Sequence, residues 1–173
     1  MNMQTPSRDA LRFGYRDTEL GTILVAASAR GVAAIFMGGD RTRLSRDLKA
    51  AFPGSNLTQD QDGMAQIISK AAALVEAPHL GTDLPLDLRG SDLQRAVWTA
   101  LQAIPSGETR SYGAIARTLP VAATAQEVGA ACAANTIAVA IPCHRVVKAD
   151  GSISGYRWGV ERKRRLINLE AVA

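Results

Sequence analysis

Residues 111–135, SYGAIARTLPVAATAQEVGAACAAN, decide how the second half of this chain folds, because two short helical patterns flank a proline there. Ser111 stands where an N-cap is expected, and the helix that it would begin ends at the proline. Thr124 and Glu127 form a capping-box pattern, which predicts a second helix over 125–135. Two short helices joined by a brief turn resemble a helix-turn-helix, which is a DNA-reading unit. A plain helical hairpin is the alternative, and these residues alone do not separate the two.

The segments on either side of this stretch indicate further helices. Ser91 and Gln94 form another capping box, and apolar residues at helical spacing predict a helix over 92–104. Near the C-terminus, apolar positions from Val160 onward predict a last helix. We therefore assign residues 86–173 to a mainly helical C-terminal domain.

The first half has the pattern of a small α/β domain. Two β-rich runs, 22–28 and 32–37, flank a turn that contains Gly31, which predicts an antiparallel hairpin. The other expected elements are one more strand and two amphipathic helices, over 11–15, 41–52 and 64–75. Proline and glycine between residues 77 and 90 indicate a linker. The fold class is therefore α/β, with an N-terminal α/β cap domain over residues 1–85.

Composition restricts the class of protein. The chain has 173 residues, of which 47% are hydrophobic and 21% are charged, as in ordinary globular domains. No apolar run approaches the roughly 18 residues of a membrane span, and residues 1–9 lack the apolar core of a secretory signal. Cys132 and Cys143 are too few for a disulfide scaffold or a four-thiolate zinc site. We therefore expect a cytoplasmic protein with free thiols, no metal and no membrane partner.

The positive charge is confined to the second half of the chain. Residues 1–90 carry ten Lys and Arg against ten Asp and Glu, whereas residues 91–173 carry ten against six. The net charge of +4 therefore comes entirely from the second half. A basic half fits a polyanionic partner such as nucleic acid. A well-solvated basic surface explains the charge equally well.

The chemistry-bearing residues gather in the motif Ile141–Val147, IPCHRVV. A thiol attacks carbon as the thiolate, and a histidine or a positive charge nearby lowers the pKa of the thiol. Adjacent side chains of an extended segment point to opposite faces, so proton transfer from Cys143 to His144 needs a bend at Pro142 or a bridging water. A buried cysteine beside a surface histidine is the alternative from the dipeptide alone.

The surrounding residues resemble a known family. The motif Pro-Cys-His-Arg-Val-Val is similar to the active-site signature of the O6-alkylguanine-DNA alkyltransferases (methylated-DNA–protein-cysteine methyltransferases). Further similar stretches, in the same order as in the family, are Val97–Trp98, Ile104–Thr109, Ser111–Tyr112, Ile115–Ala116, Cys132–Asn135 and Ser154–Gly159. The resemblance covers residues 86–170 strongly, and the first half resembles the variable cap domain of the family. The pattern is most similar to the C-terminal alkyltransferase part of the Ada-type bacterial regulators.

This resemblance implies direct repair of DNA. The protein would bind double-stranded DNA that contains O6-alkylguanine, as a monomer, and flip the damaged base out of the stack. Cys143 would then accept the alkyl group from O6 of guanine and keep it as a thioether, so that each molecule acts once. O4-alkylthymine is a second candidate lesion. The thiolate itself is the acceptor, so no cofactor is expected.

The resemblance also implies roles for catalytic residues. His144 would deprotonate Cys143 through a water, and Glu170, 27 residues after the cysteine, would orient the histidine. Tyr112 would contact the flipped guanine and protonate the leaving base. Asn135 would support the site by linking the second helix of the helix-turn-helix to the active-site loop.

Substrate and DNA contacts follow from the same resemblance. The implied substrate-binding residues are Val146, Tyr156, Arg157 and Cys132, and the implied DNA-binding residues are Gln126, Thr124 and Arg145. Gln126 lies 17 residues before Cys143, where the family has an arginine that fills the space left by the flipped base. Glutamine offers neither the charge nor the planar guanidinium of that arginine. The hypothesis is a transferase with weakened base flipping. The alternative is that Arg117 takes over the role of the missing arginine.

Other functions remain open from the sequence. A non-transferring module that binds alkylguanine in DNA, to flag damage or to regulate, would share the fold, but such proteins lack the cysteine nucleophile. A cysteine hydrolase would need an oxyanion hole and would turn over repeatedly. A transcription regulator would need a second domain.

Overall fold

The computed structural model describes residues 10–173, and contacts divide them into two compact units. The first unit contains the residues up to Glu76 together with Thr82–Asp87, and the second contains Ala77–Gly81 with Leu88–Ala173. We expected the cap domain to end after residue 85 and therefore to include residues 77–81. These residues pack with the second unit instead. None of the described helices has the length and apolar character that crossing a membrane requires.

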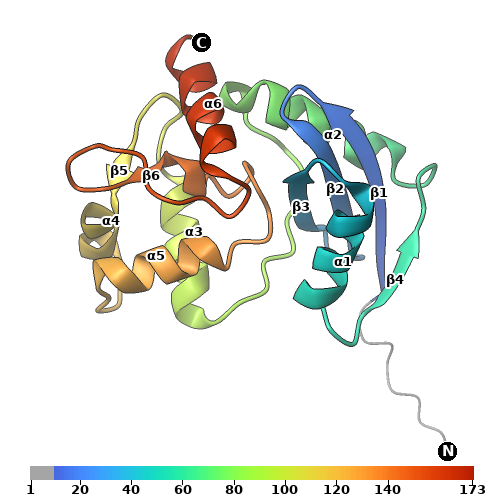
Figure 1. The fold of residues 1–173 in the computed structure, drawn as a ribbon. Coiled ribbons are helices and arrows are strands. Elements are labelled where there is room, and N and C mark those ends of the chain that lie inside the picture. Colours follow the sequence, from blue (N-terminus) through green and yellow to red (C-terminus); the bar gives the residue numbers. More distant parts are fainter. Residues whose placement is uncertain (1–9) are drawn as a thin grey trace, which may run out of the picture. The chain divides into compact units, whose positions relative to one another are not determined.

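The first unit is built on a four-stranded sheet with the order β3-β2-β1-β4 (Figure 1). Its strands are β1 (Ala10–Thr18), β2 (Gly21–Ala27), β3 (Val32–Gly38) and β4 (Asn56–Gln59). The predicted hairpin is confirmed, because β2 pairs antiparallel with β3 and also with β1. The short strand β4 was missed: it pairs parallel with β1, and its sequence NLTQ has only one apolar residue to signal a strand.

Two helices cover this sheet, and both lie where periodicity predicted them. Helix α1 (Arg41–Ala51) contacts β3 and β2, and α2 (Ala65–Glu76) contacts β1 and β2. Their buried side chains are aliphatic, with Leu44 and Leu48 on α1 and Ile68 among those on α2. Burial of such side chains supplies most of the stabilisation of a small domain, roughly 1.5–3 kcal/mol for each.

The second unit is mainly helical, as expected. Its helices are α3 (Asp92–Gln102), α4 (Tyr112–Thr118), α5 (Ala125–Ala133) and α6 (Val160–Ala171), with two 3₁₀ turns, η1 (Pro78–Leu80) and η2 (Cys143–Arg145). Both predicted capping boxes are present, at the starts of α3 and α5. Helices α3 and α5 end two residues before the expected limits. The adjoining pair α4 and α5 packs together and against α3, which confirms the helix-turn-helix arrangement.

A two-stranded ribbon lies next to the chemistry-bearing turn, and a tryptophan links α3 to α5. Strand β5 (Arg110–Ser111) pairs parallel with β6 (Val146–Val147), so the residues just after η2 lie beside the start of α4. Trp98 on α3 is buried and donates a hydrogen bond from Nε1 to Ala131 O on α5 at 2.9 Å. The two-residue strands were not predicted, because a run of two residues carries no periodicity.

Candidate active site

The cysteine motif forms a turn and not the extended segment assumed from the sequence. Pro142 has φ −80° and ψ 61°, and its carbonyl oxygen accepts a hydrogen bond from Arg145 N at 2.9 Å. The three residues of η2 therefore turn tightly, and their side chains do not alternate between two faces. All three are buried, with 4% of Cys143, none of His144 and 9% of Arg145 exposed. The bend at Pro142, one of the two routes for proton transfer that the sequence left open, therefore replaces the extended geometry.

Asn135 links the end of α5 to Cys143. Its Nδ2 donates hydrogen bonds to Ile141 O at 3.0 Å and to Cys143 Sγ at 3.3 Å, and its Oδ1 accepts from Ile137 N at 2.8 Å. A buried amide with all these partners is fixed in one orientation. Burial raises the pKa of the Cys143 thiol, while the Asn135 hydrogen bond and the positive charges of Lys163 and Arg157 lower it.

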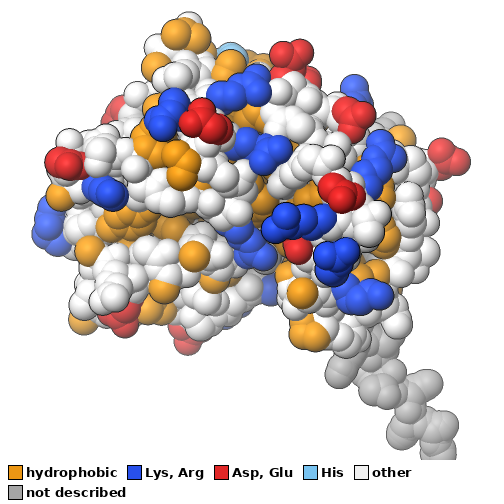
Figure 2. All heavy atoms as spheres, viewed as in Figure 1, with side chains coloured by type: hydrophobic (Ala, Val, Ile, Leu, Met, Phe, Trp, Pro, Cys, Tyr) orange, Lys and Arg blue, Asp and Glu red, His pale blue; other side chains and the backbone are white. Residues whose placement is uncertain are grey.

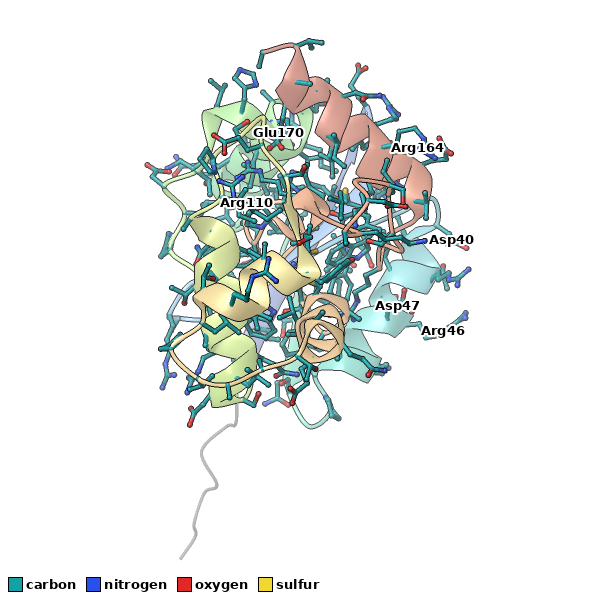
Figure 3. The ribbon with its side chains drawn as sticks, turned by 90° about the vertical axis from the view of Figure 1, so that its left-hand side faces the viewer. Asp40, Arg46, Asp47, Arg110, Arg164 and Glu170 are labelled. Carbon is teal, nitrogen blue, oxygen red and sulfur yellow. The ribbon has the colours of Figure 1, made fainter. Side chains whose placement is uncertain are left out.

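His144 and Glu170 meet beneath the turn. His144 Nε2 lies 3.1 Å from Glu170 Oε1, and the imidazole is fully buried. Glu170 comes from the C-terminal part of α6, where Figure 3 labels it. Burial lowers the pKa of His144 and favours the neutral imidazole, although the carboxylate partner opposes this shift. Neither nitrogen of His144 makes a hydrogen bond of good geometry with the described residues, so the contact of Nε2 with Glu170 is one of ion-pair distance.

Arg145 completes a buried ionic cluster with the same carboxylate. Its Nε lies 3.0 Å from both oxygens of Glu170, its Nη2 lies 2.5 Å from Oε2, and its Nη1 donates to Ile104 O at 2.7 Å. Burial alone would raise the pKa of Glu170, but hydrogen bonds and charge from His144 and Arg145 outweigh it and lower the pKa to about 2. The assignment of Arg145 to DNA binding is therefore wrong, because its guanidinium is buried and occupied by internal acceptors.

A pocket of about 410 Å³ opens over Cys143. Its walls come from α4, α5, η2 and the loop before α6, and the lining residues are Tyr112, Gly129, Cys132, Ala133, Cys143, Gly155, Tyr156 and Arg157. The four residues expected to contact the substrate or the leaving base that line this pocket together with Cys143 are Tyr112, Cys132, Tyr156 and Arg157. Val146 does not line it: it is fully buried in β6, and its N–H donates to Cys143 O.

The polar side chains of the pocket differ in their hydrogen-bond partners and in the effect of burial on their pKa. Arg157 Nη1 donates to Asn135 O at 3.0 Å, and its guanidinium carbon lies 5.7 Å from the centre of the Trp158 ring. Burial raises the pKa of Tyr156, whose hydroxyl has no partner among the described residues. Burial also raises the pKa of Cys132 to about 12. Cys132 is therefore a neutral thiol in the pocket wall, with the character of a small apolar residue.

Sequence reasoning missed a buried lysine behind this pocket. Lys163 on α6 has no exposed surface, and its Nζ donates hydrogen bonds to Ser154 Oγ at 2.9 Å and Gly155 O at 3.3 Å. Ser154 Oγ in turn shares a hydrogen bond with the hydroxyl of Tyr112. Lys163 lies in the charged run ERKRR, which is typical of a solvated helix face. The signal that could have identified it is spacing, since Lys163, Leu166 and Glu170 are three and then four residues apart and share the buried face.

The expected DNA-contact residues at the start of α5 are exposed. Thr124 is the N-cap: its hydroxyl accepts from Glu127 N at 3.1 Å, and Glu127 Oε1 accepts from Thr124 N at 2.9 Å. Gln126 is exposed in the first turn, beside that acidic side chain. No Lys or Arg occurs in the sequence between Arg117 and Arg145, so α5 itself provides no cation.

Comparison with known proteins places this geometry in a family. Residues 92–172 match the family described as "6-O-methylguanine DNA methyltransferase, DNA binding domain". The chain is 43% identical to the "Bifunctional transcriptional activator/DNA repair enzyme Ada" of Escherichia coli, over 94% of this chain but only 46% of that relative. The chain thus spans about half the length of that relative.

Relatives of similar length extend the likeness to the whole described chain. The methylated-DNA–protein-cysteine methyltransferase of Candida albicans is 35% identical, with 90% of this chain and 94% of the relative covered. The crystal structure of Mycobacterium tuberculosis OGT in complex with DNA is 34% identical and matches with a TM-score of 0.76, covering 94% of this chain and 93% of that one. The cap unit, the helix-turn-helix and the buried cysteine turn described above are therefore those of a member of the methylated-DNA–protein-cysteine methyltransferase family, to which this chain belongs.

Proposed function

We propose that this protein repairs DNA by transferring an alkyl group from O6 of guanine in double-stranded DNA to Cys143, once per molecule. The observation that carries this proposal is the position of Cys143, in the wall of a pocket and against the His144–Glu170 pair. The names of the relatives, which include DNA repair enzymes and methyltransferases, support the same chemistry.

The arrangement of these residues supports the following steps of the transfer. The thiol proton passes to His144 through a bridging water, and the ionised Glu170 stabilises the imidazolium that forms. Cys143 Sγ then bonds to the alkyl carbon while the bond from that carbon to O6 breaks. The leaving guanine takes a proton from Tyr112, which lines the same pocket. The product is a thioether, a poor leaving group, so the protein is consumed in the reaction.

The pocket requires that the base leave the duplex. Only 4% of Cys143 is exposed, so its sulfur cannot reach a base that is stacked inside DNA. A flipped guanine could enter between Tyr112, Tyr156 and the small residues of α5. The net charge of +4 suits attraction to the phosphate backbone, and the face drawn in Figure 2 carries Lys and Arg side chains interspersed with acidic ones.

Base flipping is the step in which this chain departs from its family. The exposed Gln126 occupies the position of the arginine expected to fill the space left by the base, and Glu127 beside it repels phosphates. Gln126→Arg should therefore raise the single-turnover rate on duplex DNA in a stopped-flow experiment. An unchanged rate would show that base flipping does not depend on this position, and Arg117→Ala would then test the alternative cation.

Stoichiometry tests the proposed function itself. Excess duplex carrying one O6-methylguanine is mixed with the protein, and repaired guanine is counted over time. The proposal predicts a burst that stops at one repaired base per protein and is absent in Cys143→Ala. Continued turnover would indicate a hydrolase. Tight, lesion-selective binding without any repair by the wild type would indicate the non-transferring module.

A further inference from the structure

The second unit contains a buried ammonium that the proposed transfer does not use. Lys163 has no exposed surface, and no carboxylate of the described residues forms an ion pair with its Nζ. Burying a cation without a counter-ion costs stability, so the groups that this ammonium contacts matter. Its hydrogen bonds go to Ser154 Oγ and Gly155 O, both in the loop before α6, and Gly155 lines the pocket.

Ser154 connects this ammonium to the pocket. Lys163 has only protons to offer, so Ser154 Oγ accepts from it at 2.9 Å. The same oxygen is hydrogen-bonded to the hydroxyl of Tyr112, which lines the pocket together with Cys143. The three groups form one chain from the Lys163 ammonium, whose pKa burial lowers, to a phenol that lines the pocket. Ser154 can donate its own O–H to Tyr112 while it accepts from Lys163, so the chain suits a phenolate as well as a phenol.

We propose that Lys163 and Ser154 are positioning residues that make Tyr112 the proton donor to the leaving guanine. This inference rests on the proposed alkyl transfer. As the bond from the alkyl carbon to O6 breaks, the Tyr112 proton moves to the leaving base, and the electron pair of that O–H bond stays on the phenolic oxygen. Ser154 then donates its O–H to this oxygen, and Lys163, which keeps its proton, donates to Ser154. Oxidation states do not change, and the thiol proton resides on His144.

The linkage has a specific energetic role. Burial raises the pKa of Tyr112, which by itself makes the phenol a poor acid, and the hydrogen bond with Ser154 opposes that shift. A hydrogen bond to a charged partner is stronger than one between neutral groups, so the link gains strength as the phenolate develops. Ser154 therefore assists the leaving group and not the attack by sulfur. Lys163 also favours the Cys143 thiolate, so Ser154 is the cleaner position at which to test the link.

The experiment compares two methyl donors that differ in their need for a proton. Methyl transfer to Cys143 is timed from an O6-methylguanine duplex, whose leaving guanine must be protonated, and from methyl iodide, whose iodide need not be. Ser154→Ala should slow the guanine reaction by about tenfold or more and leave the methyl iodide reaction within about twofold. Tyr112→Phe should show the same pattern, and the double variant should add little to either loss.

Two further variants serve as controls. Ser154→Thr keeps the hydroxyl and should retain most of the guanine rate. Ser152→Ala removes an exposed hydroxyl of the same loop, bonded only to Asp150 at 2.6 Å, and should leave both reactions at the wild-type rate. Lys163→Met should slow the guanine reaction more than the methyl iodide reaction.

Each outcome is informative. A Ser154→Ala protein that repairs the duplex at the wild-type rate overturns the inference and leaves the proposed transfer intact. Equal slowing with both methyl donors also overturns it, because Ser154 would then support the thiol or the fold. If the wild type accepts methyl from methyl iodide but never from the duplex, the proposed function fails, and the inference fails with it.

Discussion

Glu170→Gln tests the buried ionic cluster beneath the nucleophile. The substitution keeps the shape of the side chain but removes a charge that meets His144 at 3.1 Å and Arg145 at 2.5–3.0 Å. Only 2% of the Glu170 side chain is exposed, so water cannot replace the lost carboxylate. Arg145, with 11% of its side chain exposed, would be left as a nearly buried cation without a counter-ion. Removing one partner of a buried pair costs about 3–5 kcal/mol.

The pKa of Glu170 gives a second measure of how much this carboxylate contributes to the free energy of unfolding, and it shows how that contribution depends on pH. Folding lowers this pKa from its ordinary 4.5 to about 2, which corresponds to about 3 kcal/mol of stability at pH 7. Because the folded pKa is the lower one, this stability is fully present above pH 4.5 and is lost as the pH falls toward 2. At pH 3 only about half should remain.

Urea unfolding of the wild type and Glu170→Gln, at pH 7 and pH 3, measures both effects. The free energy of unfolding should differ by about 3 kcal/mol at pH 7, and the difference should shrink by about half at pH 3. Glu161→Gln on the same helix is the matched control, because Glu161 is 84% exposed and meets Arg164 at 3.8 Å. That control should change stability by less than about 0.5 kcal/mol. Equal stability of wild type and Glu170→Gln at pH 7, or a difference that grows on acidification, would refute this reasoning.

Three other predictions concern Cys143 and helix α5. Asn135→Ala removes a hydrogen bond to Cys143 Sγ, so the pH midpoint for alkylation of Cys143 by iodoacetamide should rise and repair should slow about tenfold; an unshifted midpoint would contradict this role. Thr124→Ala removes the N-cap of α5 and should lower the free energy of unfolding by about 1 kcal/mol, measured by urea titration. Peptide mapping of protein that has reacted with O6-methylguanine DNA should find no methyl group on Cys132, whose pKa of about 12 keeps it a neutral thiol; partial labelling there would count against the assignment.

Local signals in the sequence were sufficient for most of the fold. Ser91 and Thr124 begin α3 and α5 through capping boxes, which depend only on residues three positions apart. The hairpin of β2 and β3 follows from β-rich runs around a turn at Gly31. Strand β4 could not be found in this way, because its pairing with β1 depends on residues more than forty positions away and not on its own polar sequence.

The sequence indicated which residues belong to the site better than it indicated which of them contact each other. The resemblance identified Cys143 and Glu170, but the buried pairing of Arg145 with Glu170 requires α6 to fold back on η2. The resemblance implied that Arg145 contacts DNA, but tertiary packing makes it part of an internal ion pair with Glu170. Lys163 was missed for the same reason: its neighbours in the chain are charged and exposed, and only the packing of α6 shows that this one cation is buried.

The central claim is that Cys143 accepts the alkyl group. Intact-protein mass after reaction with a short duplex containing one O6-methylguanine tests it most directly, with Cys143→Ala measured beside the wild type. The wild type should gain the mass of one methylene group, peptide mapping should place it on Cys143, and the variant should gain nothing. A wild type that binds the duplex yet keeps its original mass, or a variant that gains the same mass, would contradict the account.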